Sequence, residues 1–164
     1  MPNLAELNEL DCAAFTRVVG PAFEHSPWIA ESAWGQRPFA SVHELHGALC
    51  ETLHAATVDE QLSLIRAHPD LVTRAVITKE SQGEQASAGL GALSDDEARK
   101  FANYNAQYRE RFGFPFVICA RLNKKEAILR AFPERLQNPP EREMETALGE
   151  ICQIAELRLH DVIT

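Results

Sequence analysis

The chain has 164 residues, of which 45% are hydrophobic, so it can form a packed core and is not a disordered segment. Its 24 acidic residues outnumber 16 basic ones and give a formal net charge of −8, which argues against nucleic-acid binding, because that binding needs Lys and Arg beside phosphates. No apolar run reaches the roughly 18 residues of a membrane-spanning helix, so no membrane association is expected.

Helices are predicted in the first half of the chain. Two capping boxes, in which a hydroxyl residue precedes a glutamate by three positions, predict helix starts at Ser41 and Thr57. The helix that starts at Thr57 should end near His68, because Pro69 disfavours helical geometry in the residue before it.

The second half continues the helical pattern. Ser81 and Ser94 begin further capping boxes, and Ser94 opens a long amphipathic helix that Gly113 should end. Pro133 should kink or break the following helix, and the last helix is expected over residues 141–160. The predicted fold class is therefore all-α: a single-domain bundle of about eight helices over residues 1–164, with no significant sheet.

The four cysteines, Cys12, Cys50, Cys119 and Cys152, are far apart and show no metal-ligand spacing. Each has apolar neighbours, so we expect buried, reduced, structural thiols. The first residues do not resemble a secretory signal, and the last four differ from the Ser-Lys-Leu peroxisomal signal. These observations predict a cytoplasmic protein.

Arg158 stands where the last helix should face the core. It continues a stripe at steps of four and three residues, formed by Met144, Leu148, Ile151 and Ala155. Its guanidinium could extend from the helix end to water, or it could be held in a pocket to bind an anion.

Three further segments depart from ordinary helical patterns. A lone histidine such as His68, at the end of an apolar helix, is usually structural, but imidazole is also the natural acid or base near neutral pH. At 81–90, capping accounts for Ser81 and Glu84, whereas the small residues that follow allow close approach of a backbone or a ligand. The apolar connection at 111–120 needs partners for its backbone groups, either from the core or from a small heterocycle with amide edges.

Seven short segments are specific in combination. They are Gln-Arg-Pro-Phe at 36–39, His-Pro-Asp-Leu at 68–71, Glu-Ser-Gln-Gly-Glu-Gln at 80–85, Ala-Gly-Leu at 88–90, Asn-Ala-Gln-Tyr at 105–108, Arg-Phe-Gly-Phe-Pro-Phe at 111–116 and Ala-Glu-Leu-Arg-Leu at 155–159. Over nearly its whole length the chain resembles the 2-oxo-4-hydroxy-4-carboxy-5-ureidoimidazoline (OHCU) decarboxylase family, whose reaction ends urate breakdown at (S)-allantoin.

The resemblance implies an all-helical carboxy-lyase, usually a homodimer, that uses no metal and no organic cofactor. It places the catalytic histidine at His68, its carboxylate partner at Glu84 and the anion-binding arginine at Arg158. Contacts to the small-molecule ureidoimidazoline substrate are expected at Pro69, Ser81, Gln82, Gly83, Glu84, Gln85, Phe116, Val117, Ile118, Cys119 and Ala120. The stretch between His68 and Glu84 is shorter here than in several animal members, which bears on the reach between these two residues.

The chemistry of this substrate is consistent with such a site. The carbon that loses CO₂ adjoins a C=N bond, which can accept the released electrons, so no external electron sink is required. The protein must hold the substrate, move protons and select the face that is protonated. Two alternatives remain open: another ureide lyase or isomerase on the same scaffold, and a non-catalytic helical binding module in which His68 and Glu84 lie far apart.

Overall fold

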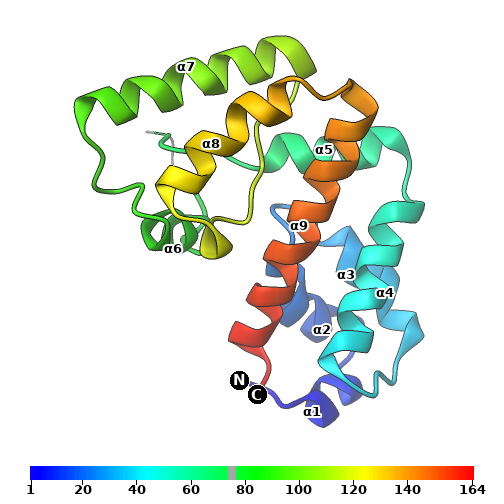
Figure 1. Ribbon diagram of the computed structural model, residues 1–164. Coiled ribbons are helices and arrows are strands. Elements are labelled where there is room, and N and C mark those ends of the chain that lie inside the picture. Colours follow the sequence, from blue (N-terminus) through cyan, green and yellow to red (C-terminus); the bar gives the residue numbers. More distant parts are fainter. Residues whose placement is uncertain (74–76) are drawn as a thin grey trace. The chain divides into compact units, whose positions relative to one another are not determined.

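A computed structural model describes residues 1–73 and 77–164 (Figure 1). These residues form nine α-helices and three short 3₁₀ helices with no strand among them, which confirms the all-α prediction. No helix of this described part is both long and apolar enough to cross a membrane. The fold consists of two compact units, a first unit of Met1–Leu64 with Cys152–Thr164 and a second unit of Ile65–Ile151. That residues 1–164 act as one domain stays a prediction.

The first unit packs short helices around an apolar core. It contains α1 (Leu4–Glu9), α2 (Cys12–Val19), η1 (Gly20–Ala22), α3 (Trp28–Ala33), η2 (Trp34–Gln36), α4 (Val42–Ala55), most of α5 (Val58–Ala67) and the C-terminal part of α9 (Pro140–Val162). Phe15, Leu49 and Leu159 are fully buried in it. The chain ends meet here, where the Thr164 N–H donates to the Pro2 carbonyl oxygen at 3.0 Å (Figure 1).

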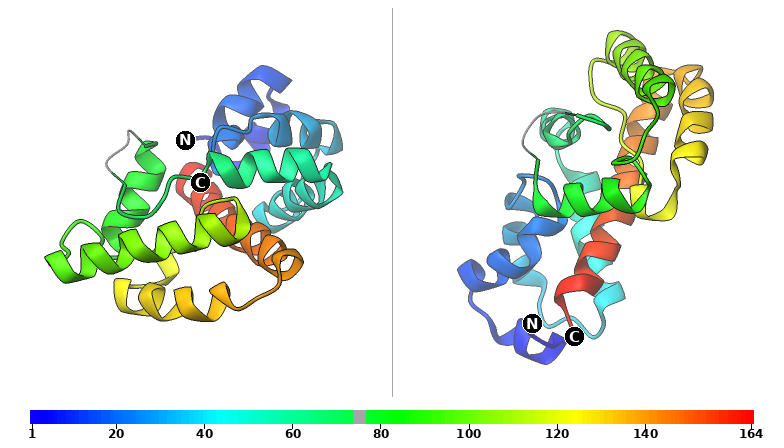
Figure 2. Two further views of the ribbon diagram at one scale, coloured as in Figure 1. Left: turned by 90° about the horizontal axis from the view of Figure 1, so that it is seen from above. Right: turned by 90° about the vertical axis from the view of Figure 1, so that its left-hand side faces the viewer.

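The second unit is built on aromatic packing. It contains the end of α5, α6 (Lys79–Ser87), α7 (Asp95–Phe112), η3 (Ala120–Leu122), α8 (Lys125–Leu136) and the N-terminal part of α9. Helices α7 and α8 lie side by side (Figures 1 and 2). Between them the Phe132 ring stacks on Tyr104 and Phe116, with centroids 5.1 Å and 3.8 Å away.

Most predicted helix ends are confirmed. Ser94 forms a complete capping box with Glu97, and Gly113 ends α7 with a left-handed φ of 76° that glycine adopts without strain. Thr57 also exchanges both capping bonds with its glutamate, and α5 ends one residue before His68.

Two helix boundaries that the sequence suggested do not occur, namely a helix start after Ser81 and a break at Pro133, where a kink was the predicted alternative. Helix α6 begins at Lys79 rather than after Ser81, because the Thr78 hydroxyl already caps it by accepting the Ser81 N–H at 3.2 Å. Pro133 does not break α8, which continues to Leu136. A proline inside a helix removes one hydrogen bond, and the buried side chains of Phe132 and Arg135 hold the helix on either side of it.

The expectation for the cysteines is only partly right. All four are free thiols, but only Cys119 is buried, while Cys12, Cys50 and Cys152 are half-buried. Apolar neighbours in sequence do not decide which face of a helix a residue occupies. Cys152 illustrates this, because it directly follows the fully buried Ile151 and is itself only half-buried.

Candidate active site

Helix α6 divides the predicted segment 81–85 between two faces. Ser81 and Glu84 are three residues apart, share one face and are both buried. Gln82 and Gly83 are exposed, and Gln85 is half-buried. The helix therefore directs a hydroxyl and a carboxyl group into the second unit.

Gln85 connects α6 to the segment that follows His68. Its Oε1 accepts the Val72 N–H at 3.1 Å, and its amide nitrogen lies 3.5 Å from the Asp70 carbonyl oxygen. Val72 has a φ of 58°, which is strained for a β-branched residue, so this hydrogen bond stabilises an unfavourable turn. His68 is buried immediately after α5, and Pro69 is half-buried. The structure thus brings the His68 segment against α6.

Helix α7 holds the same turn from another side. The Asn105 amide nitrogen donates to the Leu71 carbonyl oxygen at 2.9 Å, and Arg109 Nε lies 3.0 Å and 3.1 Å from the two oxygens of Asp70. Two helices therefore fix the backbone directly after Pro69.

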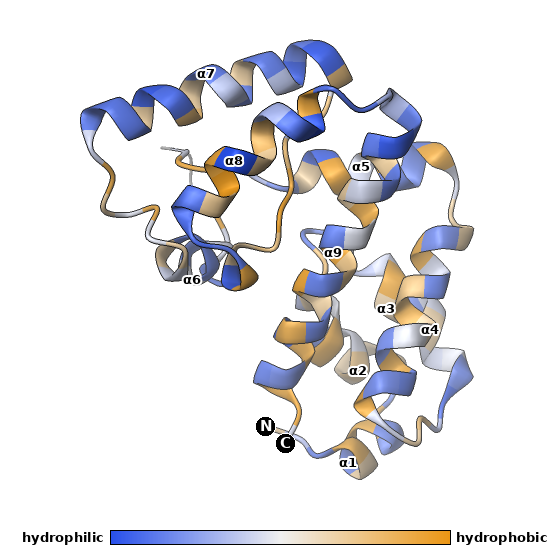
Figure 3. Ribbon diagram, in the orientation of Figure 1, coloured by the Kyte–Doolittle hydropathy of each residue, from blue (hydrophilic) through white to orange (hydrophobic). Residues whose placement is uncertain are grey.

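The connection between α7 and η3 is apolar along most of its length (Figure 3). It forms neither helix nor strand, and residues 114–120 are buried. Arg135 Nη1 donates to the Val117 carbonyl oxygen at 2.6 Å, and its guanidinium lies 4.1 Å from the centre of the Phe116 ring. The Cys119 N–H donates to Glu150 at 3.4 Å, and its carbonyl oxygen accepts from the Asn123 amide at 2.9 Å. Side chains of the protein therefore supply partners for Val117 and Cys119.

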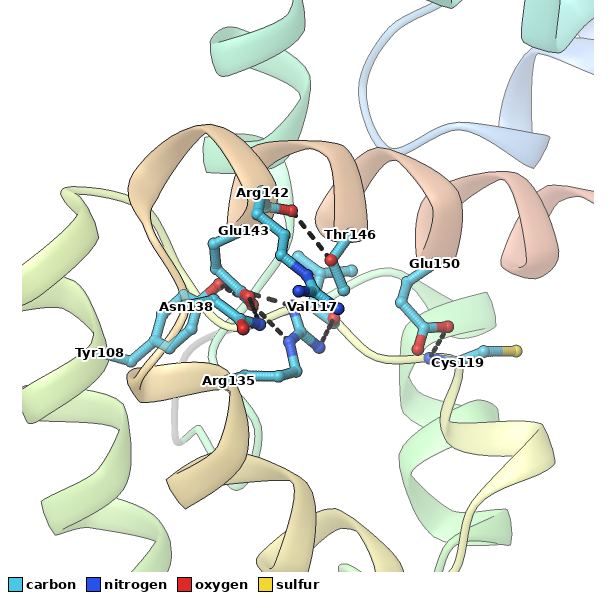
Figure 4. A network of polar contacts seen from close by, with 9 residues as sticks. All are labelled: Tyr108, Val117, Cys119, Arg135, Asn138, Arg142, Glu143, Thr146 and Glu150. Atoms are coloured by element: carbon cyan, nitrogen blue, oxygen red, sulfur yellow. Dashed lines mark hydrogen bonds and ion pairs between the residues drawn. The ribbon is translucent and has the colours of Figure 1, made fainter.

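A buried network around Glu143 fixes this connection (Figure 4). Glu143 Oε1 accepts from Arg135 Nε and, at 2.7 Å, from the Tyr108 hydroxyl. Asn138 donates to the other carboxylate oxygen at 3.0 Å. Burial raises the pKa of the Tyr108 hydroxyl above its usual range.

The sequence patterns described above did not predict this network. Arg135 follows Ile128 and Phe132 at steps of four and three residues. That is the pattern that singled out Arg158, so the same rule would have found it.

Glu84 and the connection are electrostatically linked. Burial raises the pKa of the Cys119 thiol, and the Glu84 carboxylate adds to the rise. Helix α6 also packs against η3, whose first residue is the buried Ala120. The second unit therefore gathers the His68 segment, the buried face of α6 and the residues at 116–120.

Arg158 belongs to the first unit and does not extend to water. Its Nη2 donates to Glu24 Oε1 at 2.8 Å, and its Nη1 donates to the Pro21 carbonyl oxygen at 3.0 Å. Both charged side chains are buried. The interpretation of a helix end that extends to water is therefore wrong, because the guanidinium is held in the core by Glu24 and Pro21. That Arg158 binds an anion stays a prediction.

Comparison with known families decides among the possible scaffolds. The model of the family described as OHCU decarboxylase matches residues 8–160. The chain belongs to the OHCU decarboxylase family. It is 42% identical to the 2-oxo-4-hydroxy-4-carboxy-5-ureidoimidazoline decarboxylase of Amia calva over 98% of this chain and 94% of that one.

Solved structures agree with membership of the OHCU decarboxylase family. A crystal structure of (S)-allantoin synthase superposes with a TM-score of 0.81 at 28% identity, over 98% of this chain and 54% of that one. A crystal structure of OHCU decarboxylase in the presence of (S)-allantoin gives a TM-score of 0.71 at 25% identity, over 86% of this chain and 93% of that one.

Proposed function

We propose that this chain decarboxylates OHCU to (S)-allantoin in urate breakdown. The observation that carries the proposal is the family match over residues 8–160. The polar residues that the sequence motifs single out in the second unit, His68, Ser81 and Glu84, are buried there, which supports a site rather than a solvated surface.

The reaction needs proton control more than an external electron sink. The bond between the ring carbon and the carboxylate breaks, CO₂ leaves, and the electron pair forms a C=C bond while the imine nitrogen takes up a proton. The ring hydroxyl then loses its proton to become a carbonyl, and the neighbouring carbon gains one. Delivery of that last proton to one face gives the (S) product.

The proposed acid and base is His68, which exchanges a proton with the ring hydroxyl next to the departing carboxylate. Glu84 orients the imidazole or stabilises its charged form. Ser81 and Gln85 hold the ureido or ring groups, and Pro69, Gln82 and Gly83 complete the contacts on this side. The backbone at 116–120, from Phe116 to Ala120, positions the amide edges of the substrate.

Arg158 is the proposed anion-binding group. On a chain of net charge −8, a local cation is needed to offset repulsion of an anionic substrate. The bonds from Arg158 to Glu24 and Pro21 fix its guanidinium in one orientation. We further propose a cytoplasmic homodimer that works without a metal or organic cofactor.

The test must distinguish (S)-allantoin from its mirror image, because OHCU also decays spontaneously to racemic allantoin. The substrate is generated in situ from urate with the two preceding enzymes, and circular dichroism is followed after this protein is added. A rapid (S)-allantoin signal supports the proposal. An optically silent conversion whose rate does not change with added protein would overturn it.

A further inference from the structure

A second cluster of reactive groups lies in the first unit and takes no part in the proposed reaction. His46 and Cys50 are one turn apart on α4, with the His46 ring nitrogen Nε2 3.3 Å from the Cys50 sulfur. The same nitrogen lies 2.7 Å from the carbonyl oxygen of Cys152 on α9. One imidazole therefore contacts both cysteine residues.

The two cysteines are neighbours in the first unit, because the Cys50 sulfur and the Cys152 carbonyl oxygen both lie against the same His46 nitrogen. Each thiol shifts the pKa of the other, and both residues are half-buried rather than sealed in the core. Cys152 is thus the thiol placed beside Cys50 in a half-buried cluster.

The electrostatics of the cluster favour a thiolate on Cys50. The hydrogen bond from Cys152, together with the bond and charge of His46 and the charge of His54, lowers the pKa of Cys50 to about 5. The bond to Cys50 raises the pKa of His46 to about 9, and the charge of Glu156 adds to that rise. Interaction with Cys50 raises the pKa of Cys152, so this thiol keeps its proton. One sulfur is therefore nucleophilic beside a protonated one.

We propose that Cys50 and Cys152 are a redox-active dithiol that a hydroperoxide oxidises to a disulfide linking α4 to α9 within the first unit. The Cys50 thiolate attacks a peroxide oxygen: the S–O bond forms, the O–O bond breaks, and the leaving oxygen takes a proton from the His46 imidazolium. Cys50 becomes a sulfenic acid.

The second step closes the disulfide. His46, now neutral, takes the proton of Cys152, whose sulfur attacks Cys50, so that the S–S bond forms and the S–O bond breaks. The departing hydroxide takes this proton from His46 and leaves as water. Two thiols have given two electrons to one peroxide. Two equivalents of an external thiol reduce the disulfide by exchange, which regenerates both cysteines and leaves the external thiol as its own disulfide.

Hydrogen peroxide on the reduced full-length protein tests this proposal directly. We expect intact-mass spectrometry to show that the protein loses the mass of two hydrogens. Peptide mapping should show Cys50 joined to Cys152 by a disulfide, and dithiothreitol should restore the original mass. Cys12→Ser and Cys119→Ser are the matched controls, and both variants should still form the disulfide between Cys50 and Cys152. Cys50→Ser should abolish it, and Cys152→Ser should leave a sulfenic acid on Cys50 that dimedone traps.

Three outcomes would overturn the proposal. Gain of two or three oxygens without any disulfide species would overturn the proposal, and so would a disulfide that persists in Cys50→Ser. Unmodified thiols at peroxide concentrations that oxidise glutathione would also overturn it. Because the first measurement uses the unaltered protein, misfolding of a variant cannot hide the outcome.

Discussion

Arg158 and Glu24 form a buried ion pair, with Nη2 2.8 Å from Oε1 and side-chain exposures of 6% and 1%. Removing one partner of such a pair leaves an uncompensated buried charge, whereas replacing both partners is far less costly. We therefore expect Glu24 to hold in place the arginine that the proposed function assigns to the anionic substrate.

Substitutions at this pair should separate stability from binding. Arg158→Met should lower the free energy of unfolding by about 3–5 kcal/mol, because the Glu24 carboxylate remains buried. The double variant Glu24→Gln with Arg158→Met should regain most of that loss in urea unfolding, yet keep a raised KM for OHCU. A double variant with the unaltered KM would contradict the anion-binding role.

Gln85 is expected to matter for both stability and turnover. Gln85→Leu removes the acceptor of the N–H of Val72, whose backbone is strained, and should lower the free energy of unfolding by about 1–3 kcal/mol. Gln85→Glu keeps an acceptor, so its loss of unfolding free energy should be smaller. Because the turn that Gln85 holds directly follows His68 and Pro69, we expect kcat to fall further in Gln85→Leu than in Gln85→Glu. Gln153→Leu, at an exposed position, serves as the control and should leave unfolding unchanged. Equal kcat in the two Gln85 variants would contradict the positioning role.

Local chemistry explains which helix ends could be predicted. Ser94 and Gly113 lie at the two ends of α7, and each acts on backbone groups within four residues of itself. Ser81 was misassigned because Thr78, three residues earlier, offers the same hydroxyl chemistry and a helix start takes only one cap.

Tertiary partners could not be predicted in the same way. The Glu24 partner of Arg158 lies 134 positions away, and the Tyr108 partner of Glu143 lies 35 positions away. Helical spacing shows that Arg158 faces the core, but nothing in the spacing says which carboxylate it meets. The buried polar side chains of the site were identifiable as misfits, and their partners were not.

We expect substitutions in the buried polar network of the second unit, formed by Tyr108, Arg135 and Glu143, to lower the free energy of unfolding. Glu143→Gln leaves the buried Arg135 charge without its counter-ion and should cost about 3–5 kcal/mol of unfolding free energy. Tyr108→Phe removes one hydrogen bond and should cost about 1 kcal/mol. Thermal and urea unfolding of both variants check this order, and a larger loss in Tyr108→Phe would contradict it.

Glu150 should make stability depend on pH in a direction set by its burial. Desolvation raises its pKa above the ordinary value of 4.5, so the folded protein binds this proton more readily than the unfolded chain does. The stabilisation from protonation is complete below the unfolded pKa and disappears as the pH rises through the folded pKa. Glu150→Gln, which keeps an acceptor for the Cys119 N–H, should therefore be more stable than the unaltered protein at neutral pH.

The pH series is the measurement for Glu150. The stability difference between Glu150→Gln and the unaltered protein should shrink as the pH falls toward 4.5 in urea unfolding experiments. A difference that grows on acidification would mean that the folded state favours the ionised carboxylate.

The most direct test of the proposed chemistry is the chiral assay with His68→Asn beside the unaltered protein. Asparagine can hydrogen-bond but cannot exchange a proton near neutral pH, so the enzymatic rate of (S)-allantoin formation should fall by about 10²–10⁴-fold. The thermal unfolding transition should remain cooperative. Formation of (S)-allantoin by His68→Asn at the unaltered rate would contradict the account.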